Sequence, residues 1–176
     1  MIARTTQIVS DNFRPIASTI VDTIPYSLPV AGTGTVGASL SFDGVNDWVN
    51  IPDLALNTGE FTITFWVNLN AGITNADAVM GQEGVGADLN FFNGFLRLWT
   101  GSSDAVIAST AATAGSWTRY SVRHYGSQLE IWRNGVLDGI GSWAGSFTVK
   151  AIGRGNAGFF GGKIDDVRIY DHSLPT

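Results

Sequence analysis

A chain of 176 residues, 44% hydrophobic and 14% charged, is long enough for one domain with a sizeable core. Its net charge of −5, with only ten Lys and Arg residues that form no cluster, argues against nucleic acid or an anionic membrane as partner. The absence of Cys excludes disulfides and thiolate metal sites, and no apolar run is long enough for membrane insertion.

Residues 1–37 differ in composition from the rest of the chain. They contain Pro15, Pro25, Pro29 and the segment GTGTVG, and their many apolar residues follow no clean period. We expect an extended N-terminal arm that gains order by lying on another surface, often as an added strand on a sheet edge. Other copies of the chain, or a capsid or virion protein, are the expected partners. The alternative is a brace against the chain's own domain.

From residue 38 to residue 176 the pattern is that of consecutive strands. In EFTITFWVNLN, five apolar residues alternate with polar ones or Trp; they are Phe61, Ile63, Phe65, Val67 and Leu69. Further strands are predicted over 38–42, 47–51, 87–92, 94–100, 105–109, 116–125, 128–134, 136–142 and 147–152. No helical period appears. Many short strands with close turn signals predict an all-β, antiparallel β-sandwich or jelly roll.

The last predicted strand, within GKIDDVRIYDHSLP, raises a question about its two adjacent carboxylates. Neighbouring strand residues point to opposite faces, so Asp165 is expected on the same face as Val167 and Ile169. A carboxylate on an apolar face must be paired, because leaving it bare costs several kcal/mol.

Four segments, LSFDGVNDWVNIP, FTITFWVNL, WTRYSVRHYGSQLEIWRNG and GKIDDVRIYDHSLP, follow one another at domain-wide spacing. In this order they resemble the laminin-G-like, concanavalin A-like lectin/glucanase superfamily over about residues 38–175. The resemblance implies a jelly roll of two antiparallel sheets in which the first and last strands are neighbours. It would place Asp165 near the turn at Phe42-Asp43-Gly44.

Two interpretations of these aspartates remain open. In the first, Asp43 forms an Asx-turn and the backbone N–H groups of a turn, or an Arg, satisfy Asp165; no cofactor is then needed. In the second, Asp43, Asp47 and Asp165 contribute oxygen ligands to a structural Ca²⁺ ion, as in many relatives.

The segment NFFNGFLRLWTG predicts a hairpin with its turn at Asn93-Gly94. Trp99 could stack on a sugar, with Arg97, Asn90 and Asn93 as hydrogen-bonding partners. This patch is the candidate site for cell-surface glycans. Core packing and an inter-subunit contact are the alternatives for its aromatic residues.

The sequence does not favour an enzyme. Its three Glu residues, Glu60, Glu83 and Glu130, are too far apart along the chain for the paired carboxylates of a glycoside hydrolase. His124 lies within a predicted strand, and no G-x-S-x-G elbow is present. Two G-x-G-x-x-G matches, at Gly32 and Gly153, run into strands rather than a helix and indicate turns.

These observations favour a non-enzymatic virion protein of the phage capsid decoration, spike or fibre type, attached or oligomerised through its arm. The alternative is a stand-alone, extracellular carbohydrate-binding lectin, and a glycoside hydrolase is disfavoured. No apolar stretch of the signal-peptide type follows the first Arg, which agrees with a location in the virion.

Overall fold

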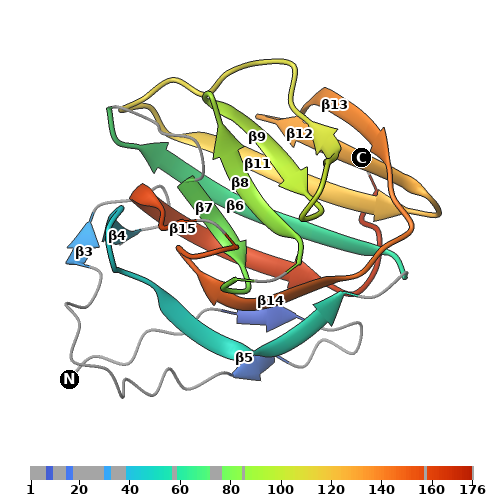
Figure 1. Ribbon diagram of the computed structural model, residues 1–176, viewed down its shortest axis with the longest axis horizontal. Coiled ribbons are helices and arrows are strands. Elements are labelled where there is room, and N and C mark those ends of the chain that lie inside the picture. The colour runs from blue at the N-terminus through green and yellow to red at the C-terminus, as the bar shows by residue number, and fades with distance from the viewer. Residues whose placement is uncertain are drawn as a thin grey trace.

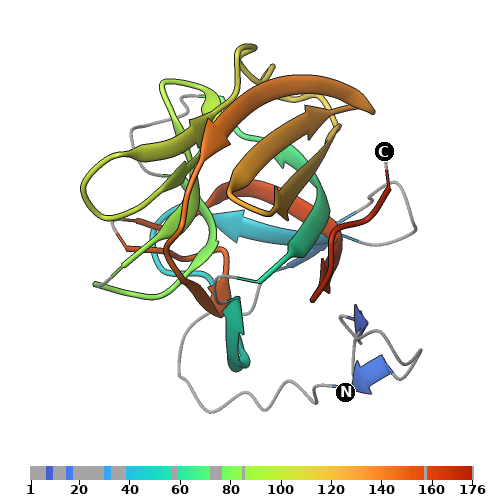
Figure 2. The same cartoon turned by 90° about the vertical axis from the view of Figure 1, so that its right-hand side faces the viewer.

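The computed structural model describes residues 39–175 apart from 57–58, 72–76, 85 and 157, together with three short strands in the arm. Within these residues the secondary structure is strand and turn, and every strand pairing is antiparallel. No helix of the described part is long and apolar enough to cross a membrane. The two main sheets overlap in Figure 1, and Figure 2 shows them as curved layers from the side.

One layer is a six-stranded sheet with the order β10-β9-β8-β7-β14-β5. Its strands are β5 (Val49–Leu56), β7 (Asp77–Gly81), β8 (Asp88–Phe92), β9 (Phe95–Trp99), β10 (Asp104–Ile107) and β14 (Phe147–Ile152). The sequence did not predict β7. All five of its residues are buried, so the alternation that marks a half-exposed strand is missing.

The other layer is a seven-stranded sheet with the order β13-β12-β11-β6-β15-β4-β3. Its strands are β3 (Val30–Gly32), β4 (Ser39–Asp43), β6 (Phe61–Leu69), β11 (Thr118–Tyr125), β12 (Gln128–Arg133), β13 (Val136–Ser142) and β15 (Gly161–Tyr170). A separate pair is formed by β1 (Gln7–Val9) and β2 (Pro15–Ala17). The first and last strands of the domain, β4 and β15, are neighbours, as expected.

The core lies between the two sheets. The five alternating residues predicted to share one face of β6, which are Phe61, Ile63, Phe65, Val67 and Leu69, are all buried in it. Tyr120 joins the layers, because its ring stacks on Phe65 of the same sheet and meets Phe91 of the facing sheet edge-on, at centroid distances of 6.0 and 5.7 Å. Burying each such aromatic side chain stabilises the fold by about 2–3 kcal/mol.

The prediction that Asp165 lies on the core face of the last strand is wrong. Asp165 pairs with Trp66 but Arg168 pairs with Thr64, so β15 carries one extra residue between these positions. This is a β-bulge, with Asp166 at φ 47°. The bulge lets Ile164 and Val167 both reach the core and leaves Asp165 half-buried on the outer face beside Trp66.

Candidate functional site

The predicted sugar patch lies on the outer face of the six-stranded sheet, away from the core. Asn90 of β8 pairs with Arg97 of β9, and Trp99 lies two residues further along the same face. Asn93 is separate from them, because it forms the hairpin turn with Gly94. Both turn residues have positive φ, 52° and 84°, as a type I′ turn requires. The structure therefore brings three of the four predicted residues together.

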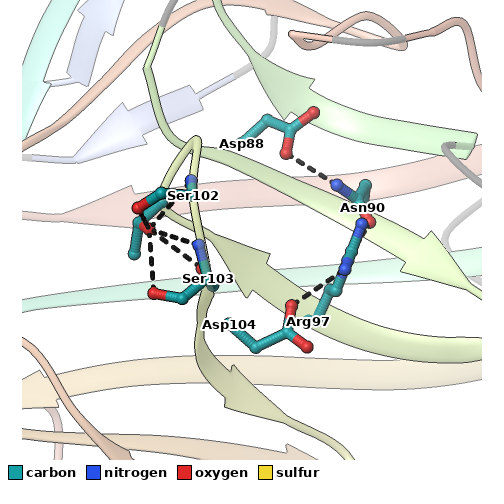
Figure 3. Close-up of polar contacts among 7 residues, drawn as sticks. Asp88, Asn90, Arg97, Ser102, Ser103 and Asp104 are labelled. Carbon is teal, nitrogen blue, oxygen red and sulfur yellow. Dashed lines mark hydrogen bonds and ion pairs between the residues drawn. The ribbon is translucent and has the colours of Figure 1, made fainter.

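The polar atoms of this patch are engaged with one another (Figure 3). Asn90 donates to Asp88 over 2.6 Å and accepts from Arg97 Nε over 2.8 Å. Arg97 Nη1 also pairs with Asp104 over 2.9 Å. Asn90 is 1% exposed, so a ligand has almost no access to it.

The guanidinium of Arg97 lies between two aromatic rings. Its central carbon is 4.2 Å from the ring centre of Phe92 and 4.6 Å from that of Trp99. Arg97 therefore has a structural role: its stacking contacts and hydrogen bonds hold the side chains of this patch in place. What this patch offers outward is the half-buried indole of Trp99 and the partly exposed Asp104.

Hydrogen bonds in two turns hold the end of this patch near Asp88 and Trp99. Thr100 Oγ1 accepts from the backbone N–H groups of Ser102 and Ser103 in the turn before β10 (Figure 3). Asp88 Oδ2 accepts from the backbone N–H of Asn156 over 3.0 Å. That second turn contains the Gly153 match, which is thus a turn packed on the sheet; Gly34 and Gly37 of the other match lie outside the described residues.

The structure does not bring the three predicted calcium ligands together. Asp43 is opposite Gly161, four residues before Asp165 on β15, which separates the two by about 13 Å along the strand. Asp43 Oδ1 accepts from Val45 and Asn46 N–H in an Asx-turn, and the N–H of Val45 above all holds the pKa of Asp43 below its usual range. Within the described residues, no three acidic or His side chains gather as a metal site.

A second candidate site lies on the outer face of the seven-stranded sheet. It is a groove of about 250 Å³, which we call the β11 groove. It is lined by Thr62, Thr64, Arg119, Ser121, Arg123 and Trp132. Because these residues alternate with residues of the hydrophobic core along β6, β11 and β12, the strand period itself places them on one face; Thr62 and Thr64 are nevertheless buried, at 3% and 5% exposed.

A buried carboxylate next to the β11 groove, that of Glu130, holds two residues of the groove lining, Arg123 and Trp132. Glu130 accepts from Arg123 Nε over 2.9 Å, from Gln128 over 2.7 Å and from the indole N–H of Trp132 over 2.8 Å. Burial raises the pKa of Glu130, but the hydrogen bonds from Trp132 and Arg123 outweigh it and leave the pKa lowered. Glu130 is therefore ionised at neutral pH, and it fixes the orientation of the indole ring.

The C-terminal segment forms one wall of the β11 groove through Leu174 and Pro175. Thr62 Oγ1 donates to the carbonyl of His172 over 3.0 Å and accepts from the N–H of Leu174 over 2.9 Å. Arg123 Nη1 donates to the carbonyl of Leu174 over 3.0 Å. These bonds hold the segment against β6 and β11.

Comparison with known proteins identifies the fold. The family model described as concanavalin A-like lectin/glucanases superfamily matches residues 43–176. The chain belongs to this superfamily. No curated protein matches the chain.

Solved structures that share this fold over part or most of their length include the following three. Domain 4 of AbnA, a GH43 extracellular arabinanase from Geobacillus stearothermophilus in complex with arabinotriose, is 20% identical (TM-score 0.67; 84% of this chain and 77% of that chain covered). A heptameric SAP-like pentraxin from Limulus polyphemus is 14% identical (TM-score 0.56; 77% and 76% covered). Trypanosoma rangeli sialidase with 2,3-difluorosialic acid is 15% identical (TM-score 0.56; 78% and 26% covered).

The sequence contained a signal for the β11 groove that the prediction did not use. In the superfamily segment WTRYSVRHYGSQLEIWRNG, the outward positions are Arg119, Ser121 and Arg123 on one strand and Trp132 on the next. A Trp among polar outward positions of adjacent strands marks a surface ring rather than a core ring. The turn at Gly126-Ser127 joins these two strands, and the NG turn at Asn134, whose two residues have positive φ, joins the strand of Trp132 to β13.

Proposed function

We propose that this superfamily member is a non-catalytic carbohydrate-binding module and that the β11 groove is its binding site. One observation carries the proposal: the groove is lined by the oriented indole ring of Trp132, the half-buried Ser121 and the guanidinium groups of Arg119 and Arg123, and no carboxylate is in the lining. An aromatic ring offers an apolar face to a pyranose, and the surrounding donors fix its hydroxyl groups.

The geometry favours binding over hydrolysis. A glycoside hydrolase needs two carboxyl groups about 5–9.5 Å apart on either side of the scissile bond. Glu130, which bonds to Arg123 and Trp132 of the groove lining, is 6% exposed and accepts bonds from three side chains. Glu83 pairs with Arg154 at a distant turn. The arabinanase domain with arabinotriose supports a binding role for this fold.

The test is glycan binding by two matched Trp variants. Trp132 and Trp99 are both half-buried and lie on the outer faces of opposite sheets. We expect Trp132→Ala to weaken binding of any glycan found on an array at least tenfold, while Trp99→Ala leaves it unchanged. Thermal unfolding of both variants controls for folding. Loss of binding in Trp99→Ala alone would transfer the site to the patch around Arg97.

A second proposal concerns attachment to a virion through the arm. In the structure β3 extends the seven-stranded sheet of its own chain by pairing Val30 with Ser41 and Ala31 with Leu40 of β4, so the arm is able to add a strand to this sheet edge. The same strand addition can be made to another copy of the chain or to a particle protein. Truncation of the arm tests this role, as argued below.

A further inference from the structure

The charges around the β11 groove differ from those of the molecule as a whole. The chain carries a net charge of −5, yet the groove lining contains Arg119 and Arg123 and no carboxylate. A cavity with one sign of charge attracts ligands of the opposite sign.

The guanidinium groups of Arg119 and Arg123 differ in their ion pairing. Arg123 is neutralised by Glu130, since its Nη2 lies 2.7 Å from Glu130 Oε2 and its Nη1 is bonded to the Leu174 carbonyl. Arg119 is exposed, and its guanidinium takes part in none of the ion pairs formed among the described residues. Within this part of the chain, no carboxylate therefore neutralises the charge of Arg119.

The backbone of Arg119 is held in place even though its side chain is exposed. Its N–H donates to the side-chain oxygen of Asn134 over 2.9 Å, and its carbonyl accepts from the N–H of Asn134 over 2.8 Å. The NG turn therefore anchors the strand position from which the guanidinium reaches the groove. Ser121 is two residues, about 7 Å, further along β11 and has Trp132 as its strand partner.

We infer that the β11 groove selects acidic glycans, with Arg119 binding the carboxylate or sulfate group of a sugar whose ring lies against Trp132. This inference rests on the proposed carbohydrate-binding function and specifies its ligand class. A guanidinium matches an anionic group with two parallel N–H donors, whereas a neutral sugar leaves its charge unused. The groove volume of about 250 Å³ lies just below the usual range for small-molecule sites, about 300–1,000 Å³, which favours a single sugar as the bound unit.

The experiment measures the affinity of the full chain for uronate, sialate and sulfated oligosaccharides and for their uncharged counterparts. Methyl esters replace the carboxylates, and desulfated sugars replace the sulfates. We expect at least one acidic probe to bind at least tenfold tighter than its counterpart. Arg119→Gln should abolish this difference, and Arg119→Lys should retain part of it because the charge remains.

Lys150→Gln is the matched charge control. Lys150 is partly exposed, pairs with Asp53 and lies on the six-stranded sheet, so its removal changes the net charge without touching the groove. The acidic preference should survive this substitution and vanish in Arg119→Gln. An equal effect of the two variants would mean unspecific attraction and would overturn the inference.

The remaining outcomes separate the two levels of the proposal. Equal binding of acidic and neutral sugars, still lost in Trp132→Ala, would overturn the acidic preference and leave the carbohydrate-binding function intact. Binding that is insensitive to Trp132→Ala, or no binding by any probe, would overturn both. Tight binding of only carboxylated or only sulfated probes supports the inference and identifies the group.

Discussion

At the scale of single residues, Glu130 organises the polar side chains on the outer face of the seven-stranded sheet. Its carboxylate accepts from Arg123, Gln128 and Trp132, and removing the charge leaves the guanidinium of Arg123 without its partner. We expect Glu130→Gln to lower the free energy of unfolding by about 1–3 kcal/mol at pH 7. Denaturant unfolding measures this loss, with the exposed Glu60→Gln as control.

The lowered pKa of Glu130 also sets the pH range of this effect. A carboxylate whose pKa falls on folding stabilises the native state above its unfolded pKa of about 4.3 and loses this contribution as pH falls through its folded pKa. The stability difference between wild type and Glu130→Gln should therefore shrink in the acid range below pH 4. A difference that stays constant from pH 7 to pH 3 would contradict this account.

Asp166 shows why the faces of the last strand were not predictable from alternation. The rule that neighbours point to opposite faces holds until one residue leaves the regular conformation, and Asp166 does so at φ 47°. Asp tolerates this region better than most residues, and Asp165 Oδ1 accepts the N–H of Asp166 over 2.8 Å. The adjacent Asp165 and Asp166 thus mark a β-bulge in this strand. A prediction that assumes strict alternation of residues between the two faces cannot detect it.

At the scale of elements, β10 and β13 close one side of the sandwich. They are the edge strands of the two different sheets, and they approach each other at Gly139 and Gly141. A methyl group at Gly141 would overlap the backbone carbonyl of Ala105, and one at Gly139 would overlap that of Ile107. The two glycines thus allow these two edge strands to approach each other closely.

This approach predicts the cost of a single methyl group. Gly141→Ala should destabilise the fold by about 1–3 kcal/mol, because a backbone oxygen cannot move aside without separating the strands. Gly59→Ala is the matched control, since nothing lies within 4 Å of its added methyl group and its φ is ordinary. Melting temperatures of the two variants compare them, and an unchanged value for Gly141→Ala would contradict the tight closure.

For the elements, the sequence was informative wherever one face is buried and the other exposed. The patterns of β6, β11 and β12 and the turns at Asn93 and Asn134 were predicted, because alternation and NG turns are local signals. The strand β7 was not, since it is buried on both faces. The grouping of Asn90 and Arg97 was predicted, but their mutual hydrogen bond and burial were not, because these depend on Asp88 and Asp104.

At the scale of the whole molecule, the arm either braces its own domain or binds another chain. β3 adds to β4 at the edge of the seven-stranded sheet, and β1 lies beside β15, so two of the three described strands of the arm lie against the chain's own sandwich. Identical contacts can form between chains at little cost, because an exchanged strand meets the same partner. An exchanged arm would also raise the avidity of a weak sugar site.

Deletion of residues 1–36 distinguishes these alternatives. The core residues that the structure describes come from β4 onward, so the truncated chain should keep its strand content by circular dichroism. We propose that the arm joins copies or attaches the domain to a particle. Light scattering should then show an assembly for the full chain and a monomer after deletion, and binding to the particle should be lost. A monomer in both cases, with particle binding retained, would mean that the arm only braces its own domain.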